Sequence, residues 1–270
     1  MDNKTTTSFG LYVDIKSILH EMDARVKLPA AIALIIVISA LPQGAWPVFV
    51  FLFMIILGLQ IASEIPFRVL YSRSLLAIPF LLAAIPVLFT IDGEALTRVT
   101  IFKTSLSITI PGLERFVHIF LKSWFSVHVA ILLAATTQMM DLLSAMRVYK
   151  VPRIIVMVFR LMWRYLSIMI TKAQRMMRAR TARSVNINGH RKKLIKQIAW
   201  QAQVTGSMAG SLFVRSLEQS ERVYQAMLSR GFDGEIRLMP QAKMTLRQKM
   251  IVILWAFFCL VLYLFSLIFG

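Results

Sequence analysis

The chain has 270 residues, of which 57% are hydrophobic, yet it carries a formal net charge of +18 and a mean hydropathy of +0.68. A soluble domain averages about 45–50% apolar residues, whereas long uncharged runs alternate here with short basic ones. The pattern excludes an ordinary soluble domain and indicates a polytopic membrane protein whose excess of Lys and Arg lies in cytoplasmic loops, so that no nucleic-acid partner is expected.

The N-terminal segment has no apolar core before Leu28, so we expect no cleavable signal peptide. Five nearly uncharged stretches then follow, each expected to cross the bilayer, for which a helix needs about 17–25 residues. They are Leu28–Leu41, Ala45–Ser63, Leu75–Thr90, Phe116–Met140 and Ile251–Gly270. The first is short and is expected to extend into Lys27 and Gln43.

The polar connection from Ile91 to Arg115 contains the alternating run TIFKTSLSITI. Alternation of this kind predicts either a short hairpin strand or a re-entrant piece.

The segment 152–170 is apolar but contains Arg160 and Arg164. An arginine near the centre of a span costs about 2.5–3.5 kcal/mol on insertion scales. These two arginines belong to a polar stripe at helical spacing, so we expect an amphipathic helix over about 152–183 that lies at the membrane interface.

The region from Lys172 to Lys249 carries sixteen basic residues against four acidic ones, which places it on the cytoplasmic side. The N-terminus is then also inside. The expected domains are a membrane domain with four spans (1–151), a cytoplasmic module of three long amphipathic helices (152–248) and a C-terminal span (249–270). The fold class is therefore an all-α integral membrane protein with about five transmembrane helices.

Within the module, the run 184–189 predicts a turn, a second helix begins near His190 and a third runs from Ser211 to Arg230. Gly206 and Gly210 between them indicate either close helix approach or a loop. Gly231 stands where a left-handed C-cap favours glycine, which places Arg230 at an exposed tip. A basic residue there serves either the helix dipole or a partner.

The runs RSLEQSERVYQAMLSRGFDG (215–234), AQRMMRARTARS (173–184) and HEMDARVKL (20–28) resemble the T component of energy-coupling factor (ECF) transporters, most closely CbiQ-like cobalt-transport permeases. The similarity covers nearly the whole chain. That family carries two Ala-Arg-Gly signatures on cytoplasmic helices, whose arginines dock into grooves of two ABC ATPases.

Carried over by this resemblance, the second signature is Ser229-Arg230-Gly231 and the first is Ala182-Arg183-Ser184, with Ala179-Arg180-Thr181 as a weaker candidate. Ser229 replaces alanine and Ser184 replaces glycine. The residues expected to support the interface are Met227, Leu228, Phe232, Arg222 and Arg180. The surface facing the substrate-binding S component is expected to include Met157, Met162 and Met169, although core packing would explain these methionines too.

The resemblance implies a subunit of an ATP-driven importer in a bacterial or archaeal cytoplasmic membrane. Its partners would be two CbiO-like ATPases, a CbiM-like S component, membrane lipid and, in some assemblies, a small accessory membrane subunit. Cobalt is the first expected substrate, nickel the second and a vitamin a more distant one. ATP and Mg²⁺ would be bound by the ATPases, and no cofactor by this chain.

The residues themselves offer little catalytic chemistry. No two glycines have the spacing of a phosphate-binding P-loop, and no carboxylate lies in the middle of an expected span. The single cysteine, Cys259, lies in an apolar run, and His118 and His128 are expected to be packed or interfacial. The alternatives are an integral-membrane enzyme with dispersed loop residues, which would turn over alone, and a basic protein that grips nucleic acid or anionic lipid.

Overall fold

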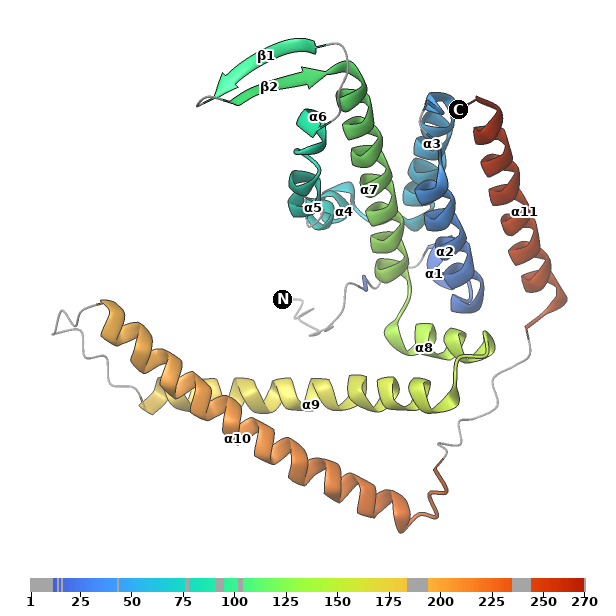
Figure 1. Ribbon diagram of the computed structural model, residues 1–270. Coiled ribbons are helices and arrows are strands. Elements are labelled where there is room, and N and C mark those ends of the chain that lie inside the picture. The colour runs from blue at the N-terminus through green and yellow to red at the C-terminus, as the bar shows by residue number, and fades with distance from the viewer. Residues whose placement is uncertain are drawn as a thin grey trace. The chain divides into compact units, whose positions relative to one another are not determined.

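The computed structural model describes residues 12, 13, 15, 17–42, 44–75, 78–90, 95–101, 104–183, 194–234 and 244–269. The chain divides into two compact units (Figure 1). Residues 1–149 and 242–270 form the first, here called the membrane unit, and residues 150–241 form the second, called the basic unit. Ser184, the predicted turn at 184–189 and the predicted helix start at His190 lie outside the described residues.

Helices dominate the membrane unit. They are α1 (Ile18–Glu21), α2 (Ala24–Ala40), α3 (Trp46–Ser63), α4 (Phe67–Ser74), α5 (Ile78–Ala83), α6 (Val87–Thr90), α7 (Ile110–Thr136), α8 (Met139–Val148) and α11 (Leu246–Phe269). Four of them, α2, α3, α7 and α11, pack together around one apolar core that includes Ile38, Leu52, Phe125 and Leu262 (Figure 1).

α2 begins at Ala24, four residues before Leu28, because Asp23 caps it, its carboxylate accepting a hydrogen bond from the Arg25 N–H at 2.9 Å. At its other end the ammonium group of Lys122, on α7, donates to the carbonyl oxygens of Ser39 (3.3 Å) and Leu41 (2.5 Å). A lysine in the middle of an apolar helix is thus explained, because it satisfies carbonyl groups that a helix end leaves without partners.

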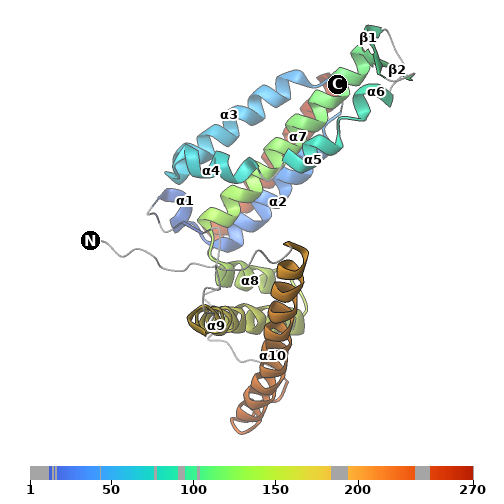
Figure 2. The same cartoon turned by 90° about the vertical axis from the view of Figure 1, so that its left-hand side faces the viewer.

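The expected third span, Leu75–Thr90, is wrong as a single helix. Its described part forms the short helices α5 and α6, which together with α4 pack along α7 (Figure 2). Pro79 lies within α5 and Pro86 directly precedes α6. Proline lacks the N–H that a continuous helix requires and disfavours helical geometry in the residue before it, which accounts for the interruption.

A two-stranded hairpin joins α6 to α7. Of the two predictions for this connection, a hairpin strand or a re-entrant piece, the hairpin is confirmed. β1 (Ala95–Ile101) pairs antiparallel with β2 (Thr104–Thr109), with Ile101 opposite Thr104 next to the turn. Thr109 then caps α7 by accepting from the Gly112 N–H at 3.3 Å. Apart from this hairpin the described elements are helices, in keeping with the expected all-α membrane fold.

By length and composition, four described helices can cross a membrane: α3, α7, α11 and α9 (Arg153–Arg183). The five expected spans are therefore not matched one for one. α2 has 17 residues, about 25 Å at the rise of an α-helix, and 75–90 is broken. α9 was expected at the interface, and that position stays a prediction.

The basic unit contains α9 and α10 (Leu194–Leu228). The long helix expected at about 152–183 is confirmed by α9. The expected three-helix module is wrong, because α10 runs unbroken through Gly206 and Gly210 for 35 residues. Each glycine costs a helix only about 1 kcal/mol relative to alanine, which the helical turns on either side outweigh.

α9 and α10 cross each other (Figure 1) and are joined by polar side chains. Lys172 donates to the amide oxygen of Gln219 at 3.2 Å. Arg180 donates to the hydroxyl of Thr205 at 3.3 Å, and its guanidinium lies 5.8 Å from the ring centroid of Trp200. These pairs run in opposite directions along the two helices, so the crossing is antiparallel.

Candidate partner-docking site

The C-terminus of α10 ends in a Schellman motif, as the glycine at 231 predicts. Gly231 has φ +77°, the left-handed conformation that residues other than glycine rarely adopt. The N–H of Phe232 donates to the carbonyl of Met227 at 3.0 Å, and the N–H of Gly231 donates to that of Leu228 at 2.9 Å. These two bonds define the motif and close the helix end. They hold Arg230 in a fixed, exposed turn.

Arg230 borders a groove of about 660 Å³, here called the tip groove, between the last turns of α10 and the middle of α9. Its lining mixes guanidinium groups from both helices, and the single carboxylate of Asp233, with the partly buried side chains of Met227 and Phe232. Cations beside apolar anchors are the features by which an acidic protein surface is bound. Met227 and Phe232 therefore lie where an interface around Arg230 needs them, while Leu228 and Ser229 are exposed beside the tip.

Arg183, at the end of α9, is exposed and borders a different groove of about 1220 Å³, here called the basic groove. Six cations line it against the single carboxylate of Glu218: Lys172, Arg175, Arg180, Arg183, Arg215 and Arg222. Ala182 is exposed next to Arg183. The two candidate arginines thus border two different grooves, which adjoin each other at Gln219 and Arg222.

Arg180 differs from Arg183 because its guanidinium already contacts Thr205 and Trp200 within the chain. It connects α9 with α10 and is less free to enter another protein. Arg222 borders both grooves and lies 3.4 Å from Glu218. Both partners are exposed, at 74% and 56% of the side chain, so this ion pair contributes little to stability.

The three methionines expected to face an S component do not share one face of α9. At about 100° per residue, Met162 and Met169 lie about 20° apart around the helix, whereas Met157 is about 140° from Met162. Met162 is exposed and the other two are partly buried. Only Met162 and Met169 offer a common surface.

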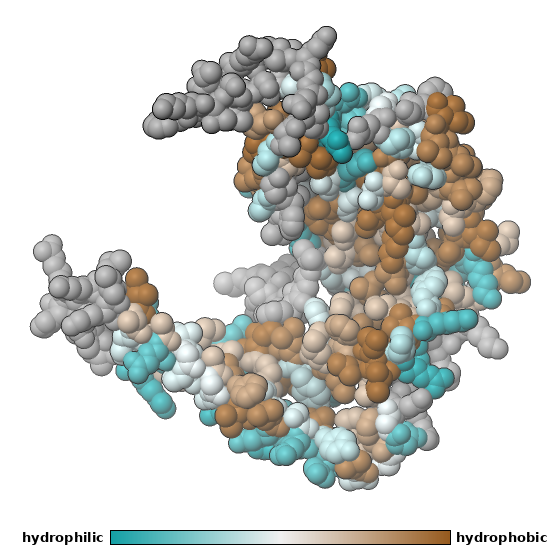
Figure 3. All heavy atoms as spheres, in the orientation of Figure 1, coloured by the Kyte–Doolittle hydropathy of each residue, from teal (hydrophilic) through white to brown (hydrophobic). Residues whose placement is uncertain are grey.

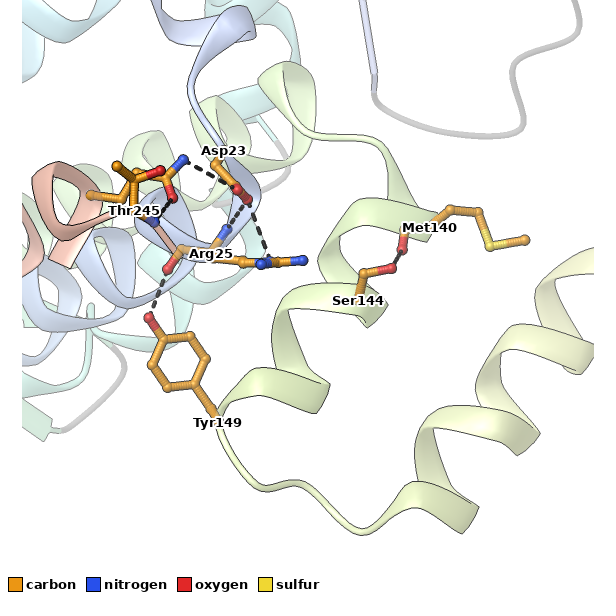
Figure 4. A network of polar contacts seen from close by, with 7 residues as sticks. Asp23, Arg25, Met140, Ser144, Tyr149 and Thr245 are labelled. Atoms are coloured by element: carbon orange, nitrogen blue, oxygen red, sulfur yellow. Dashed lines mark hydrogen bonds and ion pairs between the residues drawn. The ribbon is translucent and has the colours of Figure 1, made fainter. Parts of the chain in front are cut away.

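A second polar arrangement lies in the membrane unit, at the first turn of α2 (Figure 4). Asp23 caps the helix and its carboxylate lies 3.9 Å from Nε of Arg25. The hydroxyl of Tyr149, which follows α8, donates to the backbone carbonyl of Arg25 at 2.6 Å. The amide of Gln248, in α11, donates to the other Asp23 oxygen at 3.5 Å.

Partial burial, and secondarily the nearby carboxylate of Asp23, raise the pKa of Tyr149 above that of a free tyrosine. The phenol therefore stays protonated at physiological pH, as a hydrogen-bond donor must. The segment HEMDARVKL, which contains Asp23 and Arg25, carries no local signal of this structural role. Its contacts are with residues 124 and 225 positions away, which no local pattern reveals.

The other candidates for chemistry are packed. His118 and His128 are 2% and 3% exposed. His118 lies among the rings of Trp46 and Phe49, and His128 contacts Tyr71 and Trp124. The interpretation of both as packed histidines is confirmed. Among the described residues, no group of three or more His, Cys, Asp or Glu side chains is placed to hold a metal ion.

Apolar helices long enough to span a membrane, together with a basic pair of helices ending in an exposed arginine, indicate a membrane protein with a charged, grooved surface. Comparison with known proteins identifies the class further. The family model for CbiQ, described as a cobalt transport protein, matches residues 15–242. The chain belongs to the CbiQ family.

Three relatives are similar over part or most of their length. A protein of Methanocaldococcus jannaschii, MJ1571, is 29% identical over 85% of this chain and 76% of its own length. A second protein of that organism, MJ1089, is 26% identical over 53% of this chain and 50% of its own. The energy-coupling factor transporter transmembrane protein EcfT of Lactobacillus helveticus is 25% identical over 83% of this chain and 80% of its own.

This family and the EcfT relative consist of transmembrane components of transporters, not of enzymes. The chain is accordingly a non-catalytic, multi-pass membrane component of a transporter, of the T type in ECF systems. Membership implies that it works with ATPases and with a substrate-binding component.

Proposed function

We propose that the chain couples ATP hydrolysis by two CbiO-like ATPases to the movement of a CbiM-like S component that takes up cobalt. The observation that carries the proposal is the Schellman motif, which fixes Arg230 at an exposed helix end beside apolar anchors. Membership in a family described as cobalt transport proteins favours cobalt. Nickel is the second substrate to test, and a vitamin the third.

The chemistry of arginine suits this role. A guanidinium offers five N–H donors in a rigid fork, so a helix end can present it to a carboxylate in a partner's groove in bidentate form. Met227 and Phe232, beside Arg230 in the tip groove, and the exposed Leu228 would exclude water from that pair. Truncation of such a desolvated arginine costs about 2–5 kcal/mol of association free energy.

The proposal assigns one ATPase to each candidate arginine. Arg183 with its neighbours Ala182 and Ser184 serves one, and Arg230 with Ser229 and Gly231 serves the other. The placement of each arginine in a different groove supports two docking events rather than one. Arg222, which borders both grooves, would support both.

The remaining assignments follow the same model. The S component would contact the surface formed by Met162 and Met169, because methionine adapts to a partner that moves. ATP and Mg²⁺ would be bound by the ATPases alone. The N-terminus and the basic unit would face the cytoplasm, where positively charged loops are retained.

The test is co-purification of the full chain with its ATPases, in wild-type form and as Arg183→Glu, Arg230→Glu and the double variant. We expect each single variant to weaken capture and the double variant to abolish it, because a carboxylate replaces a cation opposite an acidic groove.

Arg178→Glu is the matched control, since it makes the same charge change at an exposed position of α9 outside either signature. Undiminished capture by the double variant, in a protein that retains its helical circular dichroism, would contradict the proposal. An equal loss of ATPase capture in the Arg178→Glu control would show a general effect of charge and not the docking of particular arginines.

A further inference from the structure

The membrane unit is joined to the basic unit at two places in the chain. The chain leaves the membrane unit after Tyr149 and returns to it at Ala242, shortly before α11 begins at Leu246. Movement of the basic unit can reach the membrane unit through the backbone only by these two connections. Where each one is held therefore matters for coupling.

Both connections are held at the first turn of α2. The hydroxyl of Tyr149 donates to the carbonyl of Arg25 at 2.6 Å. From the returning segment, the amide of Gln248 donates to the carboxylate of Asp23 at 3.5 Å, while its oxygen accepts from the N–H of Thr245 at 3.1 Å. Residues 225 positions apart in the chain thus meet at one helix end (Figure 4).

The receiving turn is itself well ordered by its neighbours. The carboxylate of Asp23 caps α2 through the Arg25 N–H, and the ammonium group of Lys27 donates to the carbonyl of Thr136, at the end of α7, at 2.9 Å. One turn further along, the indole N–H of Trp255 donates to the carbonyl of Ala30 at 3.1 Å. α2 is thereby hydrogen-bonded to α7 and α11 as well as to the residue after α8.

The exit connection is also short. Tyr149 and α9 are separated by three residues, of which Lys150 has φ +60° and Pro152 has a fixed φ. Lys150 is left-handed, and Val151 is restricted by the proline that follows it, so the backbone has few alternative conformations here. We therefore expect Tyr149 to be displaced when the start of α9 moves, because the connection cannot absorb the movement.

We propose that Asp23, Tyr149 and Gln248 form a transmission clamp, which makes α2 and α11 respond together when the basic unit moves. This role rests on the proposed function, because it concerns how work done by the ATPases reaches the membrane helices. The three are positioning residues, since they act on the helices and contact neither nucleotide nor substrate.

The first experiment uses the full chain alone in lipid nanodiscs and measures amide hydrogen exchange. Tyr149→Phe removes only the hydroxyl that reaches Arg25. We expect exchange to rise about fivefold in residues 249–252 of α11, where the amides begin to find backbone acceptors, Lys249 donating to Thr245. Fivefold is the effect of one net hydrogen bond of about 1 kcal/mol. An increase there, about a hundred residues from the substitution, is not produced by a local disturbance at Tyr149.

The second experiment uses the complex reconstituted in liposomes and measures substrate imported per ATP hydrolysed. We expect Tyr149→Phe and Gln248→Leu each to lower this ratio about fivefold while ATP hydrolysis and the melting temperature stay close to wild type. The double variant should lower the import ratio by less than the product of the two single effects, because both substitutions act on one clamp.

The matched control is Tyr263→Phe, which removes a phenol hydroxyl from α11 about 22 Å along the helix from Gln248. Unchanged exchange in residues 249–252 would overturn the clamp whether or not the ATPases bind. An unchanged import ratio, or a parallel fall in import and hydrolysis, would overturn it as well. Failure of the wild-type chain to capture ATPases would instead count against the proposed function and leave the exchange result to decide the clamp.

Discussion

In the membrane unit, α2, α3, α7 and α11 enclose a continuous apolar core, whereas in the described part of the basic unit Val156 is the only buried hydrophobic residue. Both units expose large apolar side chains, but the side chains that surround them differ. α11 presents Ile253, Leu254 and Phe257 without interruption, and its surface is predominantly hydrophobic in Figure 3. On α9 and α10 hydrophobic and hydrophilic side chains alternate (Figure 3).

The difference indicates two ways of using exposed apolar surface. An uninterrupted apolar helix is stable in lipid and needs no other partner. Amphipathic helices without a core of their own bury little apolar surface, so their stability depends on what covers them. The basic unit is therefore built to be completed by other molecules, and the membrane unit is complete in the bilayer.

The largest contrast is expected from truncating one apolar side chain in each unit. Ile38, in the core, is 0% exposed and Phe213, on α10, is 64% exposed. Ile38→Ala should lower the free energy of unfolding by about 2–5 kcal/mol through lost contacts and a cavity, and Phe213→Ala by less than about 0.5 kcal/mol. Thermal unfolding in detergent measures both. Equal losses would mean that the basic unit has a core of its own.

Replacing glycines by alanine is expected to give a smaller difference in stability between the two units. A Cβ on Gly112 would lie 2.8 Å from the hydroxyl of Thr109 and 2.9 Å from the carbonyl oxygen of Leu88, both closer than real contacts. Gly112→Ala should therefore cost about 1–3 kcal/mol, typical of overpacking, and lower the melting temperature. A melting temperature at or above that of wild type would show that the packing of α6 against α7 yields easily.

The smallest effects are expected in the basic unit, where a Cβ on Gly231 or Gly206 would meet nothing within 4 Å. Gly231→Ala places a side chain at φ +77° and should cost about 1 kcal/mol. Gly206→Ala, in the helix interior, should gain about 0.5–1 kcal/mol. Only the former should weaken capture of the ATPases. Thermal unfolding and co-purification together test this pair of variants. A change in the free energy of unfolding with the same sign for both would contradict the assignment of the cap.

The features that were predictable from the sequence are those with a local physical signal. Glycine after a helical run indicated the cap at Gly231, and the polar stripe indicated α9. Pro79 and Pro86 carried the signal for the broken segment 75–90, but the apolar composition outweighed it. The continuity of α10 was missed because two glycines resemble a break, although their cost is small against 35 residues of helix.

The remaining features depend on residues that meet only after folding. Lys122 caps α2 from α7, and Tyr149 and Gln248 reach the first turn of α2 from distant parts of the chain. A lysine within an apolar run, or a glutamine near a helix start, has many compatible partners in a sequence. The packed structure selects one of them.

The unbroken course of α10 has a mechanical consequence. At about 1.5 Å per residue its 35 residues make a rod about 52 Å long. A rotation of about 5° about one end would displace the other by about 4–5 Å, close to one helical pitch. A modest angular change imposed at the C-terminal end of α10 would thus be carried to its N-terminal end, where Trp200 lies against Arg180 of α9, and a flexible joint at Gly206 would have absorbed it. Because it runs unbroken past these two glycines, α10 would act as a lever arm under the proposed coupling.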